Sequence, residues 1–183
     1  MKVSREQAAL NRQRVVEVAS KLFREKGYDG IGVADLMKSA GLTHGGFYGQ
    51  FASKESLMTE ASTLALQNSI ANWRTKGTLP EIVDSYLSAR HRDQPDSGCP
   101  AAAMGGDIAR TLPGAQQAFA AATRQQFALL AGLMPDGDST LQHQQAITTF
   151  AAMVGAMVLA RAVGDDPLSD DILGAVRAEL LGS

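Results

Sequence analysis

The sequence predicts an all-α protein, and three observations support this fold class. Apolar side chains recur at three- and four-residue spacing over most of the 183 residues, which is the pattern of helices with one buried face. No stretch alternates apolar and polar residues as a half-buried strand would, and aromatic residues amount to only 5%. All six prolines lie at Pro80 or later, between the apolar-periodic segments. We therefore expect about nine helices and no sheet.

The N-terminal part of the chain contains three short helical patterns. Residues 15–23 place apolar side chains on one face, and Gly27 follows them as a stop signal. Residues 33–40 repeat the pattern up to Gly41, and a third short segment covers residues 44–50. Three such segments in succession predict a small helical domain at the N-terminus.

The longer helices follow. A helix is predicted at residues 54–76, with Ser53 as its N-cap and Gly77 after its end. Pro100 suits the first turn of a later helix, where a missing N–H costs nothing. Further helices are predicted at residues 79–90, 100–111, 115–134, 140–163 and 170–181, with proline, glycine and aspartate between them.

Composition excludes several classes of protein. With 45% hydrophobic and 20% charged residues, the chain can build a globular core. Residues 1–6 are charged and lack the apolar stretch of a signal peptide, and the apolar run at 151–160 is half as long as a membrane span. The single cysteine, Cys99, excludes an intramolecular disulfide and a thiolate zinc site. We expect a cytoplasmic protein with no membrane contact, metal or cofactor.

The net charge of −2 is divided unevenly along the chain. Residues 1–54 hold nine basic and five acidic side chains, a net charge of +4, so the remainder carries −6. A basic N-terminal part on an acidic body is typical of a phosphate-binding module joined to a domain that avoids phosphate. Chance variation along the chain is the alternative.

Residues 32–51 have the pattern of a helix-turn-helix unit. Gly41 allows the chain to turn through a positive φ, and Thr43 is placed to cap the second helix. Apolar residues that can close a small core with the first helix are Val33, Leu36, Met37, Leu42 and Phe47.

Hydrogen-bonding groups gather at the second helix of this unit. Gly45 and Gly46 expose bare backbone N–H groups at a helix N-terminus, at a cost of roughly 1 kcal/mol each in helix stability relative to alanine. The side chains that can donate are those of Thr43, His44, Tyr48, Gln50 and Lys54. The segment is therefore predicted to contact a phosphodiester backbone. Alternatively, Tyr48 packs in the small core, Gln50 and Lys54 are solvated, and His44 only begins a helix.

A spaced motif over about residues 10–60 resembles the tetracycline-repressor (TetR) family. The motif reads Phe23-x3-Gly27-Tyr28, then Val33-Ala34-Asp35-Leu36-Met37-x2-Ala40-Gly41-Leu42-Thr43-x-Gly45-Gly46-Phe47-Tyr48-x2-Phe51-x-Ser53-Lys54-Glu55-x-Leu57. A weaker resemblance, at residues 155–173, is to the last two helices of many members. Gly32 and Ala34 depart from the family, where many members have serine or threonine and a basic or polar residue.

The resemblance implies an all-α homodimer that regulates transcription. It implies a three-helix DNA-binding domain at 1–53 and a helical ligand-binding and dimerisation domain at 54–183. It also implies that His44 and Gly45 face base edges and that Gly46 permits close approach. The phosphate contacts would come from Thr43, Tyr48, Gln50 and Lys54.

The C-terminal helices carry two apolar stripes. One contains Ile147, Phe150, Ala151, Val154, Gly155 and Val158, and the other contains Leu173, Val176 and Leu180. The resemblance implies that these helices pair with their symmetry mates in a four-helix interface. The alternative is that both stripes belong to the core of one chain.

A small-molecule pocket is expected among the middle helices. Its predicted lining is Trp73, Tyr86, His91, Met104, Phe119, Phe127 and Phe150, with His143 as a further polar contact. Few charges occur there, so an apolar inducer is expected. Alternatively, these aromatic residues are plain core. Cys99 precedes a predicted helix, where a thiol can become reactive and sense oxidants or electrophiles; the alternative is a buried small hydrophobe.

Together these features predict a DNA-binding transcriptional regulator. The most specific form of the prediction is a repressor that a small-molecule inducer releases from a palindromic operator. Alternatives are oxidant or electrophile sensing through Cys99, or a body that docks a protein partner. An enzyme is not expected, because the sequence has no metal-ligand spacing, nucleophile elbow or phosphate-binding loop.

Overall fold

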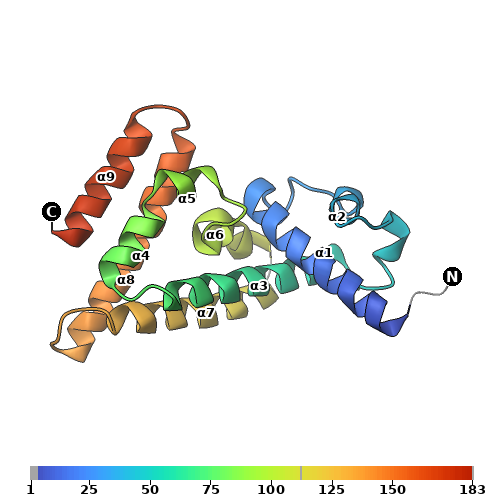
Figure 1. Ribbon diagram of the computed structural model, residues 1–183, viewed down its shortest axis with the longest axis horizontal. Helices are drawn as coiled ribbons and strands as arrows, with labels where there is room; N and C mark the ends of the chain where they lie inside the picture. Colours follow the sequence, from blue (N-terminus) through green and yellow to red (C-terminus); the bar gives the residue numbers. More distant parts are fainter. Residues whose placement is uncertain (1–3, 112, 183) are drawn as a thin grey trace.

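The computed structural model describes residues 4–111 and 113–182, and within them the fold is all-α (Figure 1). This confirms the predicted fold class. The elements are α1 (Arg5–Lys26), α2 (Val33–Ser39), the 3-10 helix η1 (His44–Gly46), α3 (Lys54–Arg74), α4 (Leu79–Tyr86), α5 (Ala89–Asp93), α6 (Pro100–Thr111), α7 (Pro113–Ala131), α8 (Ser139–Ala162) and α9 (Leu168–Leu181).

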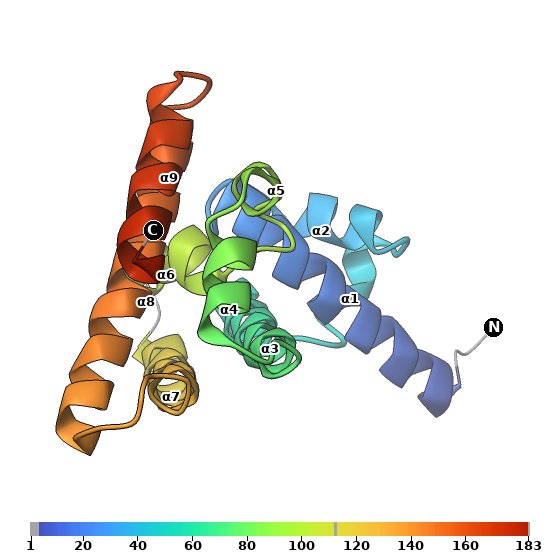
Figure 2. The same cartoon turned by 60° about the vertical axis from the view of Figure 1, so that its left-hand side comes forward.

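The helices form a head and a body. In Figure 1 the head, made of α1, α2 and η1, lies at the right, and α3 leads from it into the body. The body ends at the left in α8 and α9, which pack side by side (Figure 2). Helix α6 contacts both α1 and α8 and so lies between head and body. Helices α3 and α6 therefore both connect the head to the rest of the body.

The head is built around an apolar core to which α3 and α6 also contribute. Val15, Ala19 and Phe23 of α1 pack against Leu36 of α2 and Phe47 after η1, and all five are almost fully buried. Helix α1 ends at Gly27, where φ is +74°, and the turn after α2 is made at Gly41, where φ is +73°. Gly41 therefore has the positive φ predicted for it, and Gly27 follows the end of α1 as predicted.

Two predicted elements differ from the structure. The segment at 44–50 is only a single 3-10 turn, since Gly45 and Gly46 are poor helix formers, and the Thr43 side chain makes no capping bond. The helix predicted at 79–90 breaks after Tyr86. Ser88 then caps the separate helix α5 by accepting a hydrogen bond from the His91 N–H at 3.2 Å.

Helix α8 is the long apolar element of the body. By length and composition alone it could cross a membrane, a property that core helices of soluble proteins share. In the structure it packs against α6, α7 and α9, with Met153 and Met157 fully buried. Its partly buried character fits a helix that forms both core and surface.

Candidate nucleic-acid interface

The recognition segment, defined here as residues 43–50, has two distinct faces. Phe47 is fully buried in the head core, whereas the next residue, Tyr48, is 69% exposed. The Tyr48 ring makes edge contacts with Phe47 on one side and His44 on the other, at centroid distances of 5.2 and 6.1 Å. Thr43, His44 and Gly45 are exposed, so the predicted base-reading and phosphate-binding groups at the start of the segment face solvent together.

The two glycines of the segment are not required by the fold. A Cβ at Gly45 would meet no atom within 4 Å, and one at Gly46 would meet Met37 Cε at an ordinary 3.6 Å. Neither glycine has a positive φ. Neither packing nor backbone conformation therefore requires glycine at these two positions.

Unlike the other predicted DNA-contacting side chains, those of Gln50 and Lys54 form hydrogen bonds within the chain. The Gln50 Nε2 donates to the Gly46 carbonyl at 3.0 Å, and the Lys54 Nζ donates to the Tyr28 carbonyl at 2.6 Å. Both side chains are half-buried. The ammonium group of Lys54 has three donors and this bond uses one, so Lys54 can fix the turn after α1 and still offer charge to a phosphate.

In the body, the predicted pocket residues fall into two groups. Trp73, Tyr86, Phe127 and Phe150 form one aromatic cluster, with Trp73 5.5 Å from Phe150 and Phe127 5.9 Å from Phe150 between ring centroids. Met104 and Phe119 instead pack in the core shared with the head. His143 is exposed and touches only the edge of this aromatic cluster, through Phe127. Cavities of about 520 and 450 Å³ lie elsewhere and are lined by none of these residues.

His91 sits at the edge of the aromatic cluster and joins it to the loop 94–99. Its Nε2 accepts a hydrogen bond from the Cys99 N–H at 2.8 Å, so the ring proton is on Nδ1, which donates to the Tyr86 carbonyl at 2.7 Å. Burial lowers the pKa of His91 to about 4. Within the described residues Tyr86 Oη is buried and makes no hydrogen bond. Burial, and after it the nearby Cys99 thiol, raises the pKa of Tyr86 well above its ordinary value. Cys99 is only 5% exposed, which favours its interpretation as a buried hydrophobe.

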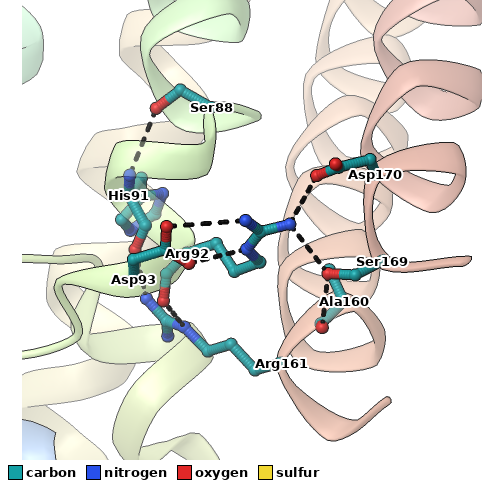
Figure 3. A network of polar contacts seen from close by, with 8 residues as sticks. All are labelled: Ser88, His91, Arg92, Asp93, Ala160, Arg161, Ser169 and Asp170. Carbon is teal, nitrogen blue, oxygen red and sulfur yellow. Dashed lines mark hydrogen bonds and ion pairs between the residues drawn. The ribbon is translucent and has the colours of Figure 1, made fainter. Parts of the chain in front are cut away.

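A polar network ties this region to α8 and α9 (Figure 3). Arg161 of α8 donates to the His91 and Arg92 carbonyls at 2.6 and 3.0 Å. Arg92 in turn reaches Ser169 and Asp170 at the start of α9, at 3.0 and 2.5 Å. A cavity of about 450 Å³ lies beside this network.

The same loop is also tied to the head. Arg24 of α1 donates to the Gly98 carbonyl at 2.9 Å. A Cβ at Gly98 would lie 2.8 Å from the His91 ring, so only glycine fits between the two. The loop 94–99 therefore has hydrogen-bonded contacts to the head at Gly98 and to the body at Cys99.

Residues 15–61, which include the recognition segment and the start of α3, match the family model described as "Bacterial regulatory proteins, tetR family". Residues 15–61 of the chain therefore have the sequence pattern of the tetR family. This confirms the resemblance stated from the spaced motif.

Curated relatives match only part of this chain. The HTH-type transcriptional repressor DhaR of Mycobacterium sp. (strain GP1) is 29% identical over 93 residues, 48% of this chain and 47% of DhaR. The HTH-type transcriptional regulator AcrR of Shigella flexneri is 31% identical over 65 residues, 36% of this chain and 30% of AcrR. The chain thus spans half or less of the length of the curated relatives it matches.

Solved structures extend the likeness of fold to the body. The reduced form of NemR from E. coli has a TM-score of 0.77 at 20% identity, covering 94% of this chain and 95% of that chain. A TetR transcriptional regulator from Chloroflexus aurantiacus has a TM-score of 0.78 at 23% identity, covering 97% and 95%. At such low identities the likeness shows the fold alone.

Sequence reasoning missed two residues that build the head. Arg12 reaches Gln50, Phe51 and Glu60 from a part of α1 that has no apolar stripe to draw attention to it. Tyr28 accepts from Lys54 through its carbonyl, and its buried hydroxyl lies 2.5 Å from the Ser62 hydroxyl. The only sequence signal for Tyr28 was its place in the family motif.

Proposed function

We propose that this protein is a cytoplasmic repressor that binds a palindromic site in double-stranded DNA as a homodimer and is released by a small apolar inducer. The observation that carries the proposal is the exposed recognition segment, with two glycines that the fold itself does not need. In this proposal His44 and Gly45 face base edges, and Gly46 lets the backbone approach. Thr43 and Tyr48 bind phosphates directly, whereas Gln50 and Lys54 combine phosphate contact with their internal bonds.

The proposed dimer is formed by α8 and α9. The stripes predicted for these helices are divided in the structure: Phe150 and Leu173 are buried within the chain, while Ile147 and Val158 are 38% and 44% exposed. Leu159 and Leu168, which are 56% and 49% exposed, add to the apolar surface of the same hairpin. A second copy can cover this surface by forming a four-helix interface, which gives two heads for two half-sites about one DNA turn apart.

The proposed inducer site is the aromatic cluster of the body. Tyr86 Oη is the buried polar group there without a partner, so an apolar ligand with one hydrogen-bonding atom would satisfy it. Trp73, Tyr86 and Phe150 are each at most 5% exposed, so entry of a ligand among them requires that a side chain move. Such a movement reaches the head through His91 and the loop 94–99, and release follows if the ligand prefers the spacing of the heads that DNA does not fit.

Selection of bound duplexes from a random DNA pool tests the proposed function. We expect a palindrome with half-sites about one turn apart. The same selection with His44→Ala should return an altered base preference at each half-site. A purified protein that is monomeric and does not bind duplex DNA even at low salt would contradict the proposal.

Gly45→Ala tests the glycine argument. Because a Cβ there meets nothing within 4 Å, the substitution should leave the free energy of unfolding unchanged or raise it by up to about 1 kcal/mol. Affinity for the selected DNA should nevertheless fall at least tenfold, since the added methyl group separates backbone and DNA. Gly114→Ala on α7, which also meets nothing within 4 Å, is the control and should keep wild-type affinity. Wild-type DNA affinity in Gly45→Ala would show that the backbone at Gly45 does not approach the DNA closely.

Val158→Glu tests the proposed dimer. A charge placed on the apolar surface of α8 is exposed in the single chain but buried without a partner in the dimer. Light scattering should show the mass of one 19.3 kDa chain where the wild type shows twice that mass, with the dimer dissociation constant raised roughly hundredfold or more. Ala121→Glu on the exposed side of α7 should leave the dimer intact. A dimeric Val158→Glu protein would place the interface elsewhere.

A further inference from the structure

The recognition segment has little means of fixing its own orientation. It contains one 3-10 turn, its N-cap makes no side-chain bond, and two of its residues are glycines. A short helix with these properties is marginal by itself, so contacts with the rest of the head must hold it. Phe47 holds its middle from inside the core.

Arg12 of α1 holds the other end. Its Nε donates to the Gln50 carbonyl at 3.3 Å, and its guanidinium carbon lies 4.7 Å from the centroid of the Phe51 ring. Its Nη2 forms an ion pair with Glu60 Oε1 of α3 at 2.7 Å. One side chain therefore joins α1, the exit of the recognition segment and α3.

We infer that Arg12 is a positioning residue for DNA recognition, and that Glu60 orients its guanidinium for that role. The inference rests on the proposed DNA binding. Arg12 contacts the end of the recognition segment that is farther from His44. A shift of Gln50 and Phe51 would therefore tilt the whole segment, including His44 and Tyr48, which are proposed to face the DNA. A planar guanidinium can bond to a carbonyl, stack on a ring and pair with a carboxylate at once, which an ammonium group cannot do.

This role differs from a contribution to folding. The side chains of Arg12 and Glu60 are 42% and 36% exposed, and a cavity of about 520 Å³ lined by both opens beside them. Exposed ion pairs of this kind stabilise a fold little. Loss of the pair should therefore change the orientation of the segment more than the stability of the head.

The role also differs from direct contact with phosphate, and salt-dependent DNA affinity separates the two. If Arg12 is a positioning residue, neither alanine nor lysine can replace it. Arg12→Ala and Arg12→Lys should then both weaken DNA binding at least tenfold. Glu60→Ala should weaken binding about as much, although it removes a negative charge from a DNA-binding head. The Arg12→Lys and Glu60→Ala proteins should keep the wild-type slope of log affinity against log salt concentration, and the Arg12→Ala/Glu60→Ala double variant should bind no worse than Arg12→Ala.

If Arg12 instead contacts phosphate directly, the variants should differ from these expectations in both DNA affinity and salt slope. Lysine would then substitute with little loss, Glu60→Ala would bind more tightly, and Arg12→Ala would lower the salt slope by about 0.9. That outcome, or wild-type affinity in all variants, overturns the inference. Arg14→Lys, at an exposed arginine of the same helix, is the matched control and should bind as the wild type does. Thermal melting near that of the wild type shows that the variants are folded, and a wild type that binds no duplex would contradict the proposed function instead.

Discussion

Phe47→Ala is expected to lower the free energy of unfolding by about 3–5 kcal/mol and to abolish DNA binding, whereas Tyr48→Ala is expected to spare stability and weaken DNA binding alone. Phe47 is fully buried between α1, α2 and Phe51, with which it stacks at 5.4 Å. Truncation of a buried phenylalanine leaves a cavity, and a small head core has few other residues to fill it. Tyr48, the adjacent residue, is 69% exposed and supports no such packing.

These two substitutions, at neighbouring positions, distinguish a side chain needed for folding from one needed for DNA contact. Urea unfolding should show Tyr48→Ala within about 0.5 kcal/mol of the wild type, as for most exposed substitutions. Titration with the selected DNA should show a loss of roughly tenfold or more for Tyr48→Ala and no measurable complex for Phe47→Ala. An unaltered Phe47→Ala protein would mean that the segment is not anchored in the head core. An unaltered DNA affinity in Tyr48→Ala would place the DNA away from this face.

The parts of the fold that depend on neighbouring residues could be predicted from the sequence. Gly41 has the positive φ expected of it, Gly27 follows the end of α1 as expected, and the Ser53 side chain accepts from the Ser56 N–H as an N-cap does. These features follow from the chemistry of a few consecutive residues. The helix break before Ser88 also depends on neighbouring residues. It was not predicted, because the apolar spacing at 79–90 continues across it and Ser88 was therefore not identified as an N-cap.

The contacts between distant residues could not be predicted in this way. Arg12 and Glu60 are 48 positions apart, and neither lies on an apolar stripe. The predicted pocket residues were chosen for their aromatic or apolar type, which cannot tell which of two cores a helix faces. Met104 on α6 faces the core shared with the head, and Trp73 at the end of α3 faces the body. That distinction depends on the crossing of α3, α6 and α7.

His91 is expected to lower the free energy of unfolding by about 3 kcal/mol when the pH drops from 7 to 4. This loss comes in addition to the one that the carboxylates cause. The folded-state pKa of His91 is about 4, and that of an unfolded histidine is about 6.5. Between these values the unfolded chain binds a proton that the folded chain refuses, so stability is fully present above pH 6.5 and is lost as the pH falls towards 4.

The main cause is burial of the ring, which disfavours the charged form of His91, while the hydrogen bond to the Tyr86 carbonyl acts in the opposite direction. A proton on Nε2 would face the Cys99 N–H, which already donates to that nitrogen, and would lie in a buried site near the positive charge of Arg161. Comparison of urea unfolding at pH 7 and pH 4.5 for the wild type and His91→Gln isolates this contribution, because the carboxylates titrate in both proteins. His91→Gln should lose less stability on acidification, and His143→Gln, at an exposed histidine, should behave as the wild type does. Equal acid sensitivity in His91→Gln and wild type would show that His91 accepts its proton without breaking the link to the loop 94–99.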